Sequence, residues 1–276
     1  MNWRSYLFHF YLDASIHVAL SVFAFIEITC VFFGLSRDNH ISYLVFFGTI
    51  ACYNFVKYGV EAKKYFLVSN TYHKNIQVVS FMAGAFAVYH SLFVSFETWI
   101  GIAVLLVLTS LYAVPLLPNA KNLRSFGGLK IFIVALVWGG TTVVLPAVAA
   151  EMALDWDIMV ELAQRFLMVL VLMLPFEIRD LDYDDPELRT LPQRFGYPRT
   201  KILGAAGMVV FFLLTFMKDH LTHLEVLGKG LVFFVLGGLL LVTKRNQSQF
   251  FSSFWVESVP IFWWACILVM DAFLSP

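Results

Sequence analysis

Three carboxylates follow a regular spacing at the end of an apolar run. Glu177, Asp180 and Asp184 are separated by three and four residues, and such steps place side chains on one face of a helix. Carboxylates that share a face repel one another unless a cation lies between them, and Mg²⁺ prefers oxygen ligands while leaving room for substrate phosphates. The spacing therefore predicts a Mg²⁺ site, and a solvated charged loop between two membrane helices is the alternative.

The chain that carries these carboxylates is very apolar. Of its 276 residues, 60% are hydrophobic and only 14% are charged, whereas a soluble domain has about 25% charged residues. This composition predicts an integral membrane protein, and the net charge of zero gives no indication of a nucleic-acid partner. Cys30, Cys52 and Cys266 lie in apolar segments and are interpreted as reduced core residues.

We expect nine transmembrane helices in a single all-α domain over residues 1–276, because a span needs about 20 mainly apolar residues. The expected spans are 14–34, 41–58, 76–95, 97–117, 131–150, 158–177, 201–218, 224–243 and 254–274. The positive residues favour one orientation. With a cytoplasmic N-terminus, only Arg37, Lys218 and Lys229 of the 19 Lys and Arg residues fall in outside segments. Arg165 lies within a span, and the C-terminus is then on the opposite side.

Two further cytoplasmic segments carry candidate binding groups. At the end of the second span Asn54 and Lys57 share one helical face, although Lys57 is also spaced to pair with Glu61. After the fourth span, Lys121, Arg124 and Lys130 lie on a basic loop that is either an anion-binding site or a consequence of topology.

Several polar or small residues within the spans are interpreted first as structural residues. Asp13 and His17 are spaced to orient each other, and His90 is read as a satisfied core histidine. Gly139 and its small neighbours permit close helix packing. Glu257, at the start of the last span, either closes the site or lies at the membrane interface.

Three segments of the chain carry a family resemblance. They read EIRDLDYDDPELRTLPQRFG, LYAVPLLPNAKNLRSFGGLKIFIVALVWG and FFSSFWVESVP. The first resembles the second acidic motif of the UbiA superfamily of intramembrane prenyltransferases. The second resembles that family's Tyr-x-x-Pro-Pro loop with its basic residues, and the third resembles the start of its last helix.

The resemblance implies a helical bundle with a central cleft open to the cytoplasmic side. In this family Mg²⁺ ions on two acidic motifs hold an isoprenyl diphosphate, whose departure leaves an allylic cation that a hydrophobic acceptor attacks. Carried over, it implies catalytic and metal-binding roles for Glu177, Asp180 and Asp184. The implied substrate-binding residues are Asn54, Lys57, Tyr112, Lys121, Arg124 and Arg179. The acceptor is a quinone precursor, a tetrapyrrole or another lipid.

One motif departs from the family pattern. The first acidic motif, Asn-Asp-x-x-Asp-x-x-x-Asp, falls on Asn54, Phe55, Tyr58 and Ala62, so that only the asparagine is kept. Lys57 is expected to face the Glu177 side of the cleft and to replace part of the missing metal charge. The open alternatives are a prenyltransferase with an altered metal requirement, a non-catalytic protein that binds a prenyl lipid or partner, and a proton- or ion-coupled transporter.

Overall fold

The computed structural model describes residues 3–35, 39–59, 70–113 and 128–274, and this part of the chain is helical without a strand. The first half contains α1 (Trp3–Asp13), α2 (Ile16–Phe33), α3 (Asn39–Asn54), the π-helical turn η1 (Phe55–Gly59), α5 (Thr71–Ser91), α6 (Phe96–Ala113), α7 (Leu129–Gly139), the π-helical η4 (Gly140–Val144) and α8 (Leu145–Ala149). The second half contains α9 (Trp156–Asp180), η5 (Pro186–Leu188), α10 (Leu191–Phe195), α11 (Tyr197–Leu214), η6 (Thr215–Met217), α12 (His223–Val242), the π-helical η7 (Phe251–Val256) and α13 (Val259–Leu274).

Seven of these segments are long and apolar enough to cross a membrane. They are Ile16–Phe33, Phe96–Ala113, Leu129–Ala149, Trp156–Asp180, Tyr197–Met217, His223–Val242 and Phe251–Phe273. The other two expected spans coincide with α3, which has 16 residues, and with α5, which carries polar residues at both ends. The chain is thus an integral, multi-pass, all-α membrane protein, while the expected count of nine spans is not confirmed.

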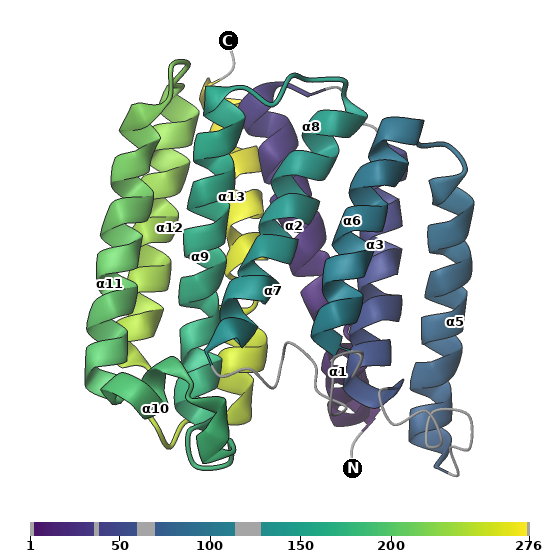
Figure 1. The fold of residues 1–276 in the computed structure, drawn as a ribbon, viewed down its shortest axis with the longest axis vertical. Coiled ribbons are helices and arrows are strands. Elements are labelled where there is room, and N and C mark those ends of the chain that lie inside the picture. Colours follow the sequence, from purple (N-terminus) through teal and green to yellow (C-terminus); the bar gives the residue numbers. More distant parts are fainter. Residues whose placement is uncertain (1–2, 36–38, 60–69, 114–127, 275–276) are drawn as a thin grey trace.

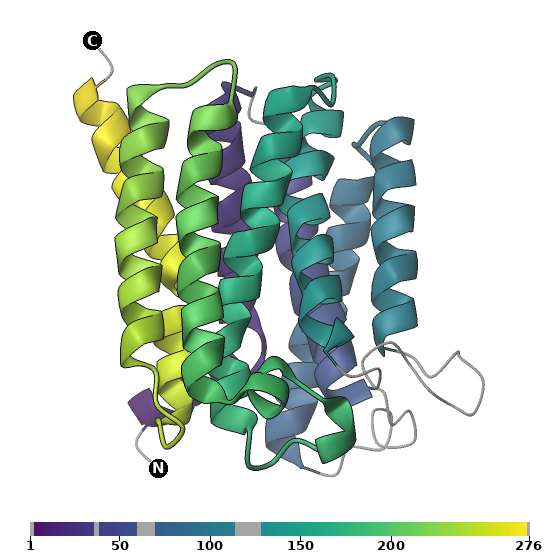
Figure 2. The same ribbon diagram turned by 60° about the vertical axis from the view of Figure 1, so that its left-hand side comes forward.

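The long helices run side by side as an antiparallel bundle (Figure 1). α2 packs against α3 and α13, and α9 packs against α7 and α11. The chain termini lie at opposite ends of the bundle, and a turned view shows the same arrangement (Figure 2). We call the end that holds α1, η1 and α10 the polar end.

Small residues let α7 and η4 approach their neighbours closely. A Cβ atom added to Gly139 would lie 2.9 Å from Cδ1 of Leu162, and one added to Gly140 would lie 2.7 Å from Cδ2 of Leu105. Both distances are too short for carbon atoms, so a larger residue at either position would force a leucine side chain to move. The packing interpretation of these glycines is confirmed.

A buried ion cluster lies at the end of the bundle opposite the polar end. It consists of Glu161, Arg165, Lys218, Glu225 and Lys229, whose side chains are no more than 1% exposed. Nζ of Lys229 lies 2.8 Å from Glu161 and 2.5 Å from Glu225, and Nζ of Lys218 lies 2.9 Å from Glu161. Lys229 was expected in an outside segment, but it lies within α12 because these buried carboxylates neutralise its charge.

Candidate functional site

The three predicted carboxylates lie where α9 ends. Glu177 and Asp180 belong to its last turn, and the amide nitrogen of Asp184 donates to the carbonyl oxygen of Asp180 at 2.8 Å, which continues the helical geometry for one more turn. The helical spacing read from the sequence is therefore present. Glu177 is buried, with 1% of its surface exposed, whereas Asp180 and Asp184 are partly exposed.

Glu177 has an unusual environment for a carboxylate. Oε2 accepts a hydrogen bond from the amide nitrogen of Leu191 at 3.4 Å, and the buried Oε1 has no hydrogen-bond partner among the described residues. Lys130, in the first turn of α7, acts on this carboxylate as an opposite charge. Buried polar atoms are almost always hydrogen-bonded, and an exception points to an ion or a functional role. The Oε1 atom is thus available to a cation.

Asp180 is engaged by the residue next to it in the chain. Nε of Arg179 lies 2.6 Å from Oδ1 and Nη2 lies 2.9 Å from Oδ2, which is a two-point ion pair. Arg179 also stacks over the ring of Phe176 at 5.3 Å. Arg179 occupies one acceptor site on each oxygen of Asp180, and its movement to another anion would free both oxygens fully for a metal.

The described residues contain no preformed group of three acidic, histidine or cysteine side chains around one metal position. The donor chemistry nevertheless fits Mg²⁺, which is commonly held by one or two carboxylates together with substrate phosphates and water. Glu177 supplies one free oxygen, and Asp180 supplies others once Arg179 is displaced. The assignment of all three carboxylates to the metal remains a prediction.

The segment after α9 folds back beneath it. Thr190 and Gln193 form a capping box at the start of α10, in which the Thr190 amide donates to Oε1 of Gln193 at 2.8 Å. Nε2 of Gln193 also donates to the carbonyl oxygen of Asp185 at 3.1 Å. These local bonds fix α10, and through Leu191 they fix the orientation of the Glu177 carboxylate.

The end of α3 lacks the row of carboxylates found at the end of α9. Asn54 is buried, accepts from Oγ of Ser15 at 2.8 Å and donates to Oγ of Ser80 at 2.9 Å. Its amide thus joins α3 to the α1–α2 connection and to α5. These hydrogen bonds give Asn54 a structural role, and its predicted contact with substrate stays a prediction.

Lys57 has a partner on α1. Its Nζ lies 3.4 Å from Oδ1 of Asp13, and the hydroxyl of Tyr58 donates to the carbonyl oxygen of Asp13 at 3.1 Å. Its ion pair in the described residues is thus with Asp13 on α1 rather than with Glu177 or Asp180, which it was expected to face. Lys57 lies within η1, and a π-helical turn interrupts the 3.6-residue period on which that expectation rested. The substrate-binding role of Lys57 stays a prediction.

Some predicted residues lie outside the described part of the chain. Lys121 and Arg124 fall in 114–127, and Glu61 falls in 60–69. Their roles stay predictions. Tyr112, close to the end of α6, is described and lines a cavity.

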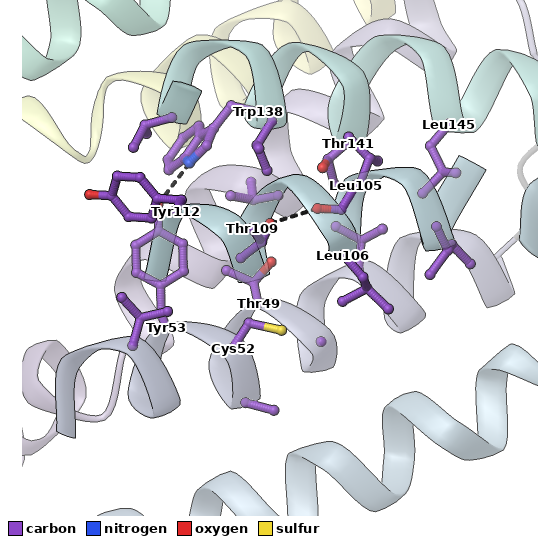
Figure 3. A pocket seen from close by; sticks show the side chains of 18 of the residues that line it. Thr49, Cys52, Tyr53, Leu105, Leu106, Thr109, Tyr112, Trp138, Thr141 and Leu145 are labelled. Atoms are coloured by element: carbon purple, nitrogen blue, oxygen red, sulfur yellow. Dashed lines mark hydrogen bonds between the residues drawn. The ribbon is translucent and has the colours of Figure 1, made fainter. Parts of the chain in front are cut away.

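This cavity has a volume of about 570 Å³ and lies between α2, α3, α5, α6, α7, α9 and the start of α13. Its wall is mainly aliphatic and aromatic. Figure 3 shows Tyr53, Tyr112 and Trp138 gathered at one end and Leu145 at the other. Phe176, which precedes Glu177, also lines it. The acidic end of α9 and the apolar cavity are therefore adjacent.

Sequence reasoning did not predict the pairings near the aromatic end of this cavity. Nε1 of Trp138 donates to Oη of Tyr53 at 2.7 Å, and Glu257 acts electrostatically on the Tyr53 side chain. Lys130 was expected on the basic loop without an assigned partner. No local pattern predicts these pairings, because each joins residues far apart in the sequence.

The ionisable groups of the first span have separate partners. Asp13 accepts from Oη of Tyr72 at 2.7 Å, His17 bonds to Oη of Tyr11 at 2.7 Å, and Glu27 accepts from Ser42 at 2.9 Å. The expectation that Asp13 and His17 orient each other is wrong. Each acquires a partner from another element instead.

The fold is shared with solved membrane proteins of low sequence identity. No protein-family model matches the sequence, and a search of curated proteins gives no match. A digeranylgeranylglyceryl phosphate synthase structure is 12% identical over 96% of both chains, with a TM-score of 0.57.

A UbiA homologue from Archaeoglobus fulgidus bound to DMAPP and Mg²⁺ is 11% identical over 96% of this chain and 99% of that chain, with a TM-score of 0.60. The structure of such a homologue bound to GPP and Mg²⁺ is 10% identical over 95% of this chain and 99% of that chain, with a TM-score of 0.58. The chain therefore has the fold of UbiA homologues, and the resemblance drawn from the sequence is confirmed at this level.

Proposed function

We propose that this chain, which has the UbiA fold, is an intramembrane prenyltransferase that transfers an isoprenyl group from an allylic diphosphate to a hydrophobic acceptor. One observation carries the proposal. The polar carboxylate of Glu177 directly follows Phe176, a residue of the cavity wall. An isoprenyl diphosphate likewise has a charged head, which suits the polar group, and an apolar chain, which suits the cavity.

The polar end supplies the groups that bind the diphosphate. Arg179 offers a planar guanidinium that binds phosphate oxygens in pairs, and Lys130 adds a second positive charge. Glu177 and Asp180 would hold Mg²⁺, which when bound neutralises charge on the leaving diphosphate. The role of Asp184 as a third ligand is part of the same proposal.

The cavity supplies the environment for the apolar chain and the acceptor. Its wall excludes water from the allylic carbon, which limits hydrolysis. The rings of Tyr53, Tyr112 and Phe176 can face a developing allylic cation. These residues orient the two substrates against each other.

We further propose that the N-terminus is cytoplasmic and the C-terminus lies on the other side. The termini are at opposite ends of the bundle (Figure 1). The polar end also carries solvent-accessible basic residues such as Lys57, Arg179, Arg189 and Arg245, whereas Lys218 and Lys229 at the other end are buried in the ion cluster.

A turnover assay tests the enzymatic proposal. The full chain in lipid nanodiscs is given GPP and Mg²⁺ together with an extracted lipid pool, and pyrophosphate release and prenylated lipids are measured. We expect Mg²⁺-dependent release that falls about 100-fold in Glu177→Gln, the scale of losing one electrostatic catalytic group. Glu97→Gln, an exposed site at the other end of the bundle, is the matched control.

The second candidate is a non-catalytic protein that binds a prenyl lipid. The loss of three carboxylates from the first motif favours it, as does the absence of a preformed three-ligand metal group in the described residues. It predicts that GPP binds without pyrophosphate release. Wild-type protein that binds GPP but shows no release above empty nanodiscs would establish this candidate instead.

A further inference from the structure

Glu257 is a cavity-lining carboxylate with no assigned role. It lies in the break between η7 and α13, and it lines the cavity together with Tyr53 and Tyr112. Within the described residues, no hydrogen bond or ion pair engages its carboxylate. Lys57 and Arg179 act on it as opposite charges, which places it near the polar end of the cavity. Burying a carboxylate in an apolar cavity wall costs free energy unless a hydrogen-bond donor or a cation pairs with it.

The backbone around Glu257 is firmly held. Its amide donates to the carbonyl oxygen of Ser252 at 3.2 Å, and its own carbonyl accepts from Oγ of Ser21. One turn earlier, Nε2 of His17 donates to the carbonyl oxygen of Phe254 at 3.1 Å. The π-helical turn and its anchors to α2 thus fix the direction in which Glu257 leaves the chain. Catalytic groups need such support to keep a productive geometry.

The neighbouring polar group has complementary hydrogen-bonding capacity. Oη of Tyr53 accepts from Trp138, so its own hydroxyl hydrogen remains available to a guest. Glu257 can only accept when ionised, and Tyr53 can donate. A hydroxyl at the reacting end of a guest satisfies both, because it donates to Glu257 and accepts from Tyr53. The aromatic rings around this point suit a flat, ring-bearing molecule.

We propose that Glu257 is a catalytic residue that binds the hydroxyl of a phenolic acceptor and takes its proton, an inference that rests on the proposed transferase function. In this step the bond between C1 of the allylic group and the diphosphate oxygen breaks, and its electron pair leaves with the diphosphate. The phenol forms the new bond to C1 through its oxygen, which gives an ether, or through the ring carbon that this oxygen activates, which gives a dienone. The dienone then loses its ring proton and regains a hydroxyl proton, so that the phenol ring is restored. The hydroxyl proton passes to the Glu257 carboxylate. A carboxylate is basic enough, because the hydroxyl becomes strongly acidic as the new bond forms.

A binding experiment tests this role separately from turnover. The full chain in zwitterionic nanodiscs is equilibrated with 4-nonylphenol or with its methyl ether, 4-nonylanisole, and protein-free nanodiscs correct for partitioning. We expect the wild type to prefer the phenol about tenfold, the affinity ratio for one hydrogen bond to a charged group. Glu257→Gln should lose the preference, and Glu257→Asp should keep part of it.

Glu27→Gln is the matched control, since Glu27 is also a buried carboxylate of the spans but does not line the cavity. It should retain the wild-type preference. Equal binding of phenol and ether by the wild type, or an unchanged preference in Glu257→Gln, would overturn the role of Glu257. A phenol preference without pyrophosphate release from GPP would instead overturn the transferase function and leave the binding site standing.

Discussion

Replacing Lys229 by methionine should destabilise the protein strongly, although the site is far from the cavity. Nζ of Lys229 bonds to Glu161 at 2.8 Å, to Gln164 at 2.5 Å and to Glu225 at 2.5 Å, and the side chain is fully buried. Methionine keeps most of the apolar stem, so the change isolates the loss of the charge and its three hydrogen bonds.

The magnitude depends on the charges that stay in the cluster. Removing one partner of a buried ion pair costs about 3–5 kcal/mol when the other charge is left alone. Here Glu161 and Glu225 both keep Lys218. Burial alone would lower the pKa of Lys218, but these two carboxylates outweigh it and raise the pKa, so Lys218 stays charged. The oxygen of Gln164 that bonded to Lys229 loses this partner, which costs about 1–3 kcal/mol. We therefore expect a total loss of about 3 kcal/mol.

Reversible unfolding in mixed micelles with increasing SDS measures this free energy. Lys74→Met is the matched control, because Lys74 is exposed at the start of α5 and should change stability by less than about 0.5 kcal/mol. A Lys229→Met protein as stable as the control would refute the reasoning, because the buried network would then contribute nothing beyond its apolar contacts.

Three further changes have defined outcomes. Gly48→Phe should reduce the affinity for long prenyl diphosphates more than the affinity for DMAPP, because Gly48 lines the cavity. The protein should still fold, because a Cβ at this position meets nothing within 4 Å. Titrations with diphosphates of increasing chain length measure these affinities. Gly140→Val should lower the free energy of unfolding by about 1–3 kcal/mol, because its Cβ would lie 2.7 Å from Leu105. Asp13→Asn should cost less than about 1 kcal/mol in the same unfolding assay, because its pair with Lys57 is half exposed and 3.4 Å long and because the amide oxygen of asparagine can still accept from Tyr72.

Local patterns predicted the helical placement of the three carboxylates. Glu177, Asp180 and Asp184 lie at a helix end that continues for one more turn, so the three- and four-residue spacing predicted their helical arrangement. The apolar runs likewise predicted the membrane class and the approximate helix positions. These features depend on neighbours within a few residues, which a sequence displays directly.

Features that depend on distant partners could not be predicted in the same way. Lys57 pairs with Asp13 because α1 lies beside η1, and neither the π-helical turn nor this contact leaves a periodic signal. Trp138 and Tyr53 are 85 residues apart, and Glu161 pairs with Lys218 and Lys229, which follow α11 in the chain. The cavity itself results from the packing of several helices. Such contacts become visible only in the folded chain.

Calorimetric titration tests whether the acidic end of α9 binds an isoprenyl diphosphate through Mg²⁺. The titrant is geranyl S-thiolodiphosphate, which resists cleavage, and the full chain is held in nanodiscs with and without Mg²⁺. We predict Mg²⁺-dependent binding that Asp180→Ala abolishes. Asp182→Asn, whose carboxylate pairs with Arg245 at the surface, should bind as the wild type does. Equal Mg²⁺-dependent affinity in wild type and Asp180→Ala would contradict this prediction.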